Sequence, residues 1–354
     1  MSVELIHTPL THPEGLPSAA QLTDEGLKDV EDLMIRLSTG DRLDRCGAMV
    51  VEHLSTGGKR LRAQLALAAC RLLNVDRASA VAWAAACELL HNASLIHDDV
   101  QDGDRMRRGM PTTWARHGVA QAINAGDLLL MLPGLAVDHV PADDAVRYRL
   151  SRALSFYAAR TVRGQSSEMA LLSLGRLSWS DYEHAARGKT AALFALPVYG
   201  AALLAGRSEA DARAVAGEFE RLGFVFQIQD DVLDVFGNAN NRPLGSDVRE
   251  GKITALVVEH LAQYPEDRSW LCGILACSRE MTTDTDVQQV RRRFQFAGAL
   301  DEVLERIYRL ASATFESPIL AAEPGLNETA RILLQRMLQP IRHLDSSLPT
   351  GDVL

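Results

Sequence analysis

The chain has 354 residues, of which 47% are hydrophobic and 23% are charged, and this ordinary globular balance excludes a disordered or fibrous protein. Its 46 Asp and Glu residues outnumber its 37 Lys and Arg residues and give a formal net charge of -9, which argues against a nucleic-acid partner. The 5 cysteines are odd in number and show no CxxC spacing, so we expect a reducing compartment and no zinc site.

The N-terminal segment and the hydropathy of the chain predict a soluble, cytoplasmic protein. Residues 1–22 are rich in Pro, Thr and His and predict a flexible arm, without the basic start and apolar stretch of a signal peptide. The apolar run at 191–205 is interrupted by Pro197 and Gly200, and no run reaches the roughly 18 residues needed to span a bilayer. We therefore expect no membrane span.

Helical periodicity extends over residues 23–345, and the alternating pattern of β-strands is almost absent. Capping-box spacing, in which a serine precedes an acidic residue by three positions, occurs at 180–183 and at 208–211. The second box predicts a helix that ends at Gly237. We expect one all-α domain over 23–345, a tail at 346–354, and helices over 59–73, 78–102, 120–138, 143–172, 208–236, 252–263, 285–314 and 327–343.

Two acidic clusters with the same spacing are the most informative feature of the sequence. A single cluster of this kind is more often a solvated helix end, but two on apolar helices favour a metal site. Positions i and i+4 share a helix face, where like charges repel, and the dipole at a helix C-terminus also disfavours anions. Oxygen ligands without a Cys or His pattern favour Mg²⁺. The clusters are Asp98, Asp99 and Asp102, and Asp230, Asp231 and Asp234.

Basic residues accompany both clusters in contexts that suit phosphate groups. Lys59 and Arg62 follow two glycines just before a predicted helix, where free backbone N–H groups favour an anion. A glycine turn before a basic helix is more often structural, so this motif alone is weak. Further cations stand at Arg107, Arg108, Lys189 and Lys252.

The motifs together resemble the trans-isoprenyl diphosphate synthase family over roughly residues 50–255. The resemblance implies the isoprenoid synthase type I fold, a bundle of long helices around a deep central cavity, and a homodimer. One departure is Ala63, which stands where the family pattern often has proline. The motifs are, in order, GGKRLR, LLHNASLIHDDVQDGDRMRRGMPT, AGD, RGQ, GKTAALF, FQIQDDVLDVFG and GSDVREGK.

The resemblance also implies roles for individual residues in the condensation of isopentenyl diphosphate with an allylic diphosphate. Three Mg²⁺ ions would be held by Asp98, Asp102 and Asp230, with Asp99, Asp231 and Asp234 in supporting roles. The allylic diphosphate would be bound by Arg107, Lys189 and Lys252, and isopentenyl diphosphate by Lys59, Arg62, His91 and Arg108. Lys189, Thr190 and Gln227 would lie near the allylic cation. The departing diphosphate would accept the final proton.

Product length is predicted from the residues upstream of the first aspartate. Farnesyl-stopping relatives usually place an aromatic residue four or five positions before it, whereas this chain has Ala93 and Ser94 there. Trp83 is the first bulky residue upstream on a compatible stretch, about 22 Å from Asp98 along the helix. The prediction is therefore geranylgeranyl diphosphate (C20), ahead of a C25–C40 product and of farnesyl diphosphate.

Two alternatives of other classes share parts of this pattern. A class I terpene cyclase has the same fold and one aspartate-rich motif, but it lacks the basic pocket that Lys59, Arg62 and Arg108 predict. A non-catalytic regulatory subunit of a heteromeric synthase would tend to have lost one aspartate cluster, and both clusters are present here. A prenyl-chain-elongating transferase remains the leading hypothesis.

Overall fold

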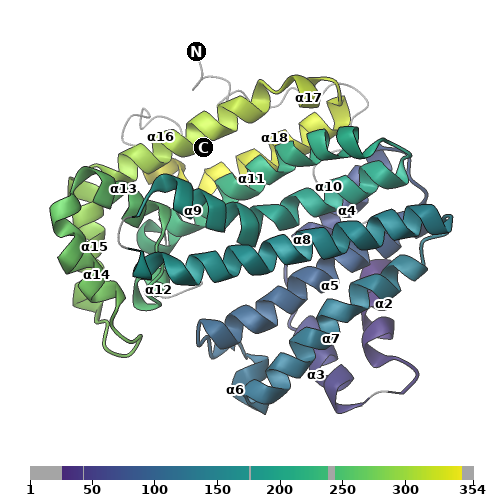
Figure 1. Cartoon of the computed structure of the whole chain (residues 1–354), viewed down its shortest axis with the longest axis horizontal. Coiled ribbons are helices and arrows are strands. Elements are labelled where there is room, and N and C mark those ends of the chain that lie inside the picture. Colours follow the sequence, from purple (N-terminus) through teal and green to yellow (C-terminus); the bar gives the residue numbers. More distant parts are fainter. Residues whose placement is uncertain (1–25, 43, 175–176, 238–243, 345–354) are drawn as a thin grey trace. The chain divides into compact units, whose positions relative to one another are not determined.

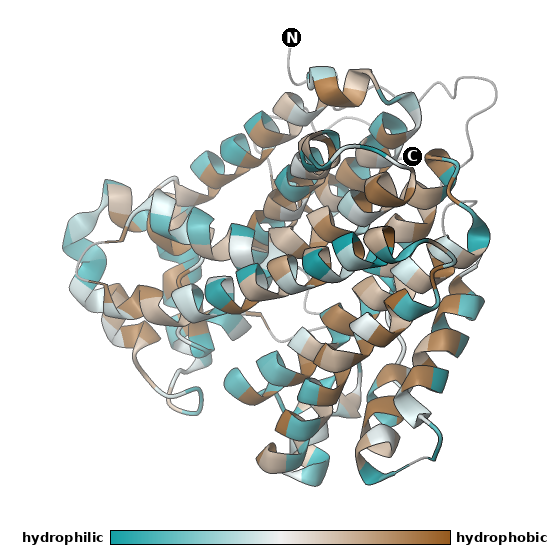
Figure 2. Cartoon of the chain, turned by 45° about the vertical axis from the view of Figure 1, so that its right-hand side comes forward, coloured by the Kyte–Doolittle hydropathy of each residue, from teal (hydrophilic) through white to brown (hydrophobic). Residues whose placement is uncertain are grey.

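A computed structural model describes residues 26–42, 44–174, 177–237 and 244–344. The expected arm at 1–22 and the expected tail at 346–354 lie outside these described residues. Within them the regular structure is helical apart from one short antiparallel hairpin (Figure 1), so the expected all-α class is confirmed. Brown and teal segments alternate along the helices in Figure 2, as expected of helices that bury one side.

The chain divides into two compact units, which are described in turn. The N-terminal unit comprises the described residues up to Ala159 together with Leu193–Gly217, and the C-terminal unit comprises Arg160–Ala192 and the described residues from Glu218 onward. Helices α8 (Asp144–Ala170) and α11 (Glu209–Phe236) have residues in both units, which agrees with one all-α domain.

The N-terminal unit is built around the long helix α5 (Arg77–Gln101). This helix packs against α7 (Val119–Asp138), α4 (Leu61–Leu72) and α2 (Leu27–Thr39). Its first turn is capped by the Asp76 carboxylate, which accepts a hydrogen bond from Ser79 N at 2.9 Å. Large buried side chains such as Trp83 and Leu129 fill the core of this unit. Besides parts of α8, α10 (Ala192–Leu204) and α11, the unit contains α2 (Leu27–Thr39), α3 (Arg45–Ser55), α4 (Leu61–Leu72), α5 (Arg77–Gln101), β1 (Met106–Arg107), β2 (Met110–Pro111), α6 (Thr113–His117) and α7 (Val119–Asp138).

Helix α7 is apolar on two sides. One side packs on α5, where Gly126 lies so close to His97 that a Cβ there would be 2.2 Å from the ring. The other side exposes Met131 and Leu135, which are 67% and 51% accessible. By length and composition alone, α7 is the one helix in the described part of the chain that could cross a membrane.

In the C-terminal unit, α13 (Ala255–Gln263) packs against α16 (Ala299–Phe315), α15 (Asp284–Phe296) and α9 (Trp179–Ala186). Buried His260 lies 2.9 Å from the Asp267 carboxylate, which also accepts two hydrogen bonds from Arg293. With parts of α8 and α11, the unit contains η2 (Leu171–Ser173), α9 (Trp179–Ala186), the π-helical turn η3 (Arg187–Ala191), α12 (Ser246–Arg249), α13 (Ala255–Gln263), η4 (Pro265–Asp267), α14 (Arg268–Leu275), α15 (Asp284–Phe296), α16 (Ala299–Phe315), α17 (Pro318–Ala321), α18 (Pro324–Leu338) and η5 (Gln339–Leu344).

Two predicted helix boundaries are wrong. The capping box expected at 180–183 forms instead between Ser178 and Asp181, whose side chains each bind the other's backbone N–H. The helix expected over 285–314 is broken between α15 and α16, because Gly298 takes a left-handed conformation with φ 77°. The Ser208 cap and the end of α11 before Gly237 are confirmed.

Candidate active site

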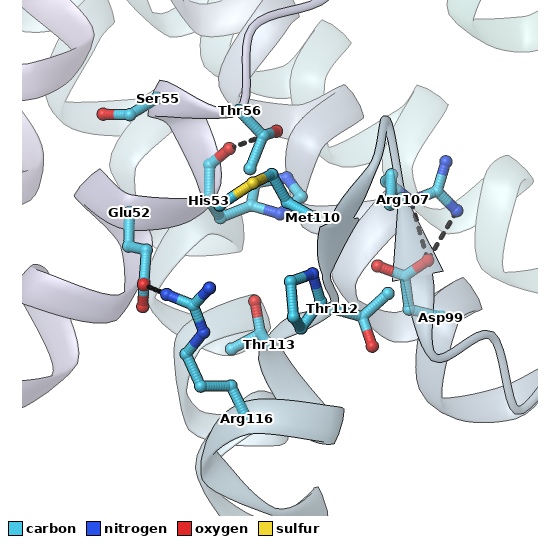
Figure 3. A pocket seen from close by; sticks show the side chains of 11 residues that line it. Glu52, His53, Ser55, Thr56, Asp99, Arg107, Met110, Thr112, Thr113 and Arg116 are labelled. Carbon is cyan, nitrogen blue, oxygen red and sulfur yellow. Dashed lines mark hydrogen bonds and ion pairs between the residues drawn. The ribbon is translucent and has the colours of Figure 1, made fainter.

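The first aspartate motif lies at the C-terminal end of α5. Asp98 and Asp102 are half-buried, whereas Asp99 is only 1% exposed. Asp99 Oδ1 accepts a hydrogen bond from Arg107 Nε at 2.7 Å and lies 2.6 Å from a second guanidinium nitrogen (Figure 3). Burial raises the pKa of Asp99, and the Arg107 guanidinium opposes that rise. Asp99 therefore anchors the hairpin β1–β2 to α5.

A cavity of about 290 Å³ lies against this ion pair (Figure 3). An ion pair between Glu52 and Arg116 lies at another part of its wall. Neither Asp98 nor Asp102 lines the cavity, which therefore lies on the side of the motif where Asp99 binds Arg107. The lining residues are Glu52, His53, Ser55, Thr56, Asp99, Arg107, Met110, Pro111, Thr112, Thr113 and Arg116.

The two glycines before α4 bring the hairpin against the loop that carries Lys59. Arg108, itself left-handed with φ 52°, donates a hydrogen bond to Gly57 O. Its guanidinium lies directly on Gly58, where a Cβ would be 2.4 Å from Arg108 Cζ. Gly58 also has φ 127°, a conformation that side chains disfavour. Lys59, the next residue, is exposed beside this contact.

Arg62 and His91 are half-buried residues in the same unit, and each has a buried side-chain nitrogen. Arg62 Nε and His91 Nδ1 have no hydrogen-bond partner among the described residues, and the Arg62 guanidinium lies 4.8 Å from the Phe194 ring centroid. Burial lowers the pKa of Arg62 to about 10. Burial, followed by the charges of Arg62, Arg107 and Arg108, lowers the pKa of His91 well below its ordinary value. A buried guanidinium N–H without a hydrogen-bond partner is costly, so an anion would suit this place.

Arg60, between Lys59 and Arg62, turns inward and was not assigned a role from the sequence. Its φ of 46° places it at the N-cap of α4, where its side chain donates to Glu31 and to Leu54 O. Glu88 of α5 lies 3.9 Å from Arg60 and accepts a hydrogen bond from Ala63 N. A proline at position 63 has no N–H to donate, so this chain has a link between α4 and α5 that the common family pattern lacks.

The second aspartate motif lies near the end of α11 in the C-terminal unit. Asp230 is exposed, whereas Asp231 is buried. Asp231 accepts hydrogen bonds from Tyr182 OH, Gln227 Nε2 and Ala255 N at 2.7, 2.8 and 2.8 Å. Burial and the nearby Asp247 carboxylate raise the pKa of Asp231 to about 8, and the three donors act in the opposite direction.

Asp234 holds the next element of the chain. Its two carboxylate oxygens accept hydrogen bonds from Ser246 N and Asp247 N, both at 3.1 Å, and so satisfy free donors at the start of α12. Lys252, which follows this short helix, lies 2.6 Å from Glu250 and 3.7 Å from Asp247. The lysine predicted to bind diphosphate is therefore surrounded by carboxylates.

Lys189 and Thr190 lie in the π-helical turn η3. This turn approaches α8 through two glycines, since a Cβ on Gly164 would be 2.1 Å from Lys189 N. Lys189 Nζ is paired with Glu168. Thr190 Oγ1 donates to Gln227 Oε1 at 2.5 Å. A π-turn at a functional position is a recurrent feature of enzymes.

The residues assigned to product length lie on α5. Ala93 is fully buried, whereas Ser94 is half-buried and donates to His91 O at 2.8 Å. Trp83 is fully buried, with its indole N–H donating to Pro197 O at 2.9 Å and its ring against Gly200 of α10. Trp83 is thus fixed at both the polar and the apolar part of its ring.

The predicted site residues thus fall into two groups, each described within its own unit. The N-terminal unit brings the hairpin arginines to the loop of Lys59, beside Arg62 and His91. The C-terminal unit links Thr190 to Asp231 through Gln227, with Lys189 in the same turn as Thr190. Within the described residues, no three Asp, Glu, His or Cys side chains form a metal cage. Asp98 and Asp102 of the first motif and Asp230 of the second still suit Mg²⁺, which binds one or two carboxylates and completes its shell with water and phosphate oxygens.

Comparison with known proteins agrees with this arrangement. A sequence profile of the Polyprenyl synthetase family matches residues 44–293. Short chain isoprenyl diphosphate synthase from Methanocaldococcus jannaschii is 37% identical over 61% of this chain and 66% of its own length. Geranylgeranyl diphosphate synthase from Mycobacterium tuberculosis is 32% identical over 79% of this chain and 81% of its own length.

A solved structure has the same fold. The polyprenyl synthase from Caulobacter crescentus, described as complexed with calcium and isoprenyl diphosphate, superposes with a TM-score of 0.80 at 27% identity, over 92% of this chain and 99% of its own. Fold and motifs define a helical prenyltransferase. The chain belongs to the polyprenyl synthetase family of isoprenyl diphosphate synthases.

Proposed function

We propose that the chain condenses isopentenyl diphosphate with an allylic diphosphate in the presence of Mg²⁺, and that its main product is geranylgeranyl diphosphate. The observation that carries the proposal is a pair of buried nitrogens beside Arg108, Arg62 Nε and His91 Nδ1, which have no hydrogen-bond partner among the described residues. A basic group for a second diphosphate is what a chain-elongating synthase needs and a cyclase does not.

The reaction separates charge, and the side chains suit that task. Mg²⁺, when bound, neutralises the diphosphate that leaves with the electron pair of the broken C–O bond. We assign its ligands to Asp98, Asp102 and Asp230, and the anchoring of both motifs to Asp99, Asp231 and Asp234. Arg107, Lys189 and Lys252 bind the allylic diphosphate, and Lys59, Arg62, His91 and Arg108 bind isopentenyl diphosphate. The oxygens of Thr190 and Gln227 stabilise the allylic cation.

The new C–C bond forms when the double bond of isopentenyl diphosphate attacks the allylic carbon. The resulting cation loses a proton to the departing diphosphate, which restores a double bond and leaves a chain longer by five carbons. No protein nucleophile is required. Dry surroundings protect both cations from water.

Product length depends on the space along α5 below Asp98. Ser94 lies one turn below Asp98 on the same face and is half-buried, whereas Ala93 is already enclosed by protein atoms. A small residue at position 94 leaves room for a long chain, and the name of the mycobacterial relative supports a C20 product.

One assay tests reaction and product together. The protein is incubated with Mg²⁺, isopentenyl diphosphate and each of three allylic starters (C5, C10 and C15), and the products are separated by carbon number. We expect C20 from all three starters, and a Ser94→Phe variant should stop about one isoprene unit earlier. A parental product that ends at C15, or a variant with unchanged product, would contradict this assignment of product length.

We also propose that the chain forms a homodimer through the exposed side of α7. The apolar stripe of α7, defined as Val119, Ile123, Met131 and Leu135, follows one side of the helix at spacings of four and eight residues. Exposed Asp127 lies in the middle of this stripe, 3.4 Å from His97. The Asp127 carboxylate would be costly against lipid, so its place at the centre of the stripe favours contact with another protein surface.

A further inference from the structure

Tyr182 of α9 is a buried residue whose hydroxyl contacts the second aspartate motif. The side chain is 4% exposed, and its ring lies 5.3 Å from the Trp179 ring and 6.1 Å from the Phe224 ring. Its hydroxyl donates to Asp231 Oδ2 at 2.7 Å. Ala255 N donates to the same oxygen, so one carboxylate oxygen joins α9, α11 and the start of α13.

The other oxygen of Asp231 determines which way the Gln227 amide faces. Asp231 Oδ1 accepts a hydrogen bond from Gln227 Nε2 at 2.8 Å. This hydrogen bond holds the amide nitrogen toward Asp231 and the amide oxygen toward Thr190. Thr190 then donates its only proton to Gln227 Oε1 at 2.5 Å. Thr190 Oγ1 and Gln227 Oε1 thus keep only lone pairs for any further neighbour.

This order of donors and acceptors matters if a cation forms next to Thr190 and Gln227. Two oxygens with free lone pairs stabilise a positive charge, whereas a reversed amide would present its partly positive NH₂ group and destabilise it. The orientation of Gln227 depends on Asp231, and the position of Asp231 depends in part on Tyr182. The tyrosine is not among the residues that the sequence motifs single out.

We propose that Tyr182 is a positioning residue for cation formation, acting through Asp231 on the amide of Gln227. The proposal rests on the prenyltransferase function proposed above. The Tyr182 hydroxyl donates to Asp231, whereas Lys189 is paired with Glu168 and Lys252 with Glu250. Its loss should therefore slow the chemical step and leave the binding of both diphosphates unchanged.

The first experiment compares Tyr182→Phe with the parental enzyme. Phenylalanine keeps the ring between Trp179 and Phe224 and removes only the hydroxyl. We expect kcat to fall about 10-fold, near the upper end of the effect of one lost hydrogen bond, with both KM values within about twofold of the parental values. Tyr199→Phe is the matched control, because the Tyr199 hydroxyl interacts with Arg213 instead of Asp231, and its kcat should remain parental.

A second experiment separates positioning from general support of the fold. Tyr182→Phe is introduced into a Gln227→Met background, where no amide remains to be oriented. We expect it to lower kcat there by less than about twofold, because the two residues act in one chain of contacts. An equal fall in both backgrounds, a parental kcat in Tyr182→Phe, or a change confined to KM would overturn the proposal. A parental protein without synthase activity would overturn the proposed function, and this proposal with it.

Discussion

Asp98 and Asp99 are neighbours in sequence, yet their carboxylates have different surroundings. Asp99 is buried and bound by Arg107, whereas Asp98 is half-buried on the side that it shares with Asp102. The second motif repeats the contrast, with Asp231 buried and Asp230 exposed. In each pair, the first aspartate is suited to bind a cation and the second to hold the motif in place.

This contrast predicts different effects for two substitutions. Asp98→Ala should lower kcat by about 100-fold or more, because a carboxylate that binds Mg²⁺ is lost, while the thermal midpoint changes little. Asp99→Ala should lower the free energy of unfolding by about 1.5–3 kcal/mol, since a charged hydrogen bond to Arg107 is removed. Steady-state kinetics and thermal unfolding of both variants check this. Near-parental turnover of Asp98→Ala in Mg²⁺ would refute the metal assignment.

The three basic residues at 59, 60 and 62 also differ in role. We expect Arg62→Ala to raise the KM for isopentenyl diphosphate by roughly 10-fold or more, because a charge-assisted contact of about 1.5–3 kcal/mol is lost. Lys252→Ala should instead raise the KM for the allylic substrate. Arg60→Ala is a control that should chiefly lower the thermal midpoint, since Arg60 binds Glu31 and Leu54 O. Equal effects of Arg62→Ala and Lys252→Ala on both substrates would contradict the division.

The helices could be predicted from the sequence where the apolar periodicity extends over many residues and a capping or helix-ending residue marks its limit. α5, α7 and α8 begin and end within a few residues of their predicted bounds. The break at Gly298 was missed, because the apolar period continues on both sides of the glycine and only its left-handed conformation ends α15. The hairpin β1–β2 has two residues per strand, too few to show alternation.

The site was predictable where charged residues form local motifs, and not where the fold recruits distant partners. The spacing of the aspartates and of Lys59 and Arg62 can be read directly, but the three donors on Asp231 come from positions 182, 227 and 255. From the sequence, Gly58 could be recognised only as a turn residue. Glycine is required there because the guanidinium of Arg108, fifty residues away in sequence, leaves no room for a side chain. Such pairings depend on tertiary contacts that a single sequence does not reveal.

The contacts that join η4 to α15 predict a pH dependence of stability. The hydrogen bonds from Arg293, and to a lesser extent the contact with His260, lower the pKa of Asp267 in the folded state. A lowered carboxylate pKa stabilises the fold above the unfolded value of about 3.9, and this stabilisation is lost as the pH falls through the folded pKa. Asp267→Asn should therefore unfold more easily by about 1 kcal/mol at pH 7, and denaturant titrations should show the difference disappear in acid. A difference that persisted unchanged below that pKa would contradict the assignment.

For the assembled protein, the apolar stripe of α7 predicts a dimer that charged side chains would disrupt. Met131 and Leu135 are the most exposed members of the stripe, one helical turn apart. The double variant Met131→Glu, Leu135→Glu would place two carboxylates at the interface, where each charge without a partner disfavours association. We expect the parental protein to elute at the mass of a dimer in light-scattering chromatography and the double variant at the mass of a monomer. Met281→Glu is the matched control, because Met281 is 70% exposed outside the stripe, and it should leave the dimer intact. A parental monomer, or a double variant that remains dimeric, would show that α7 does not form the interface.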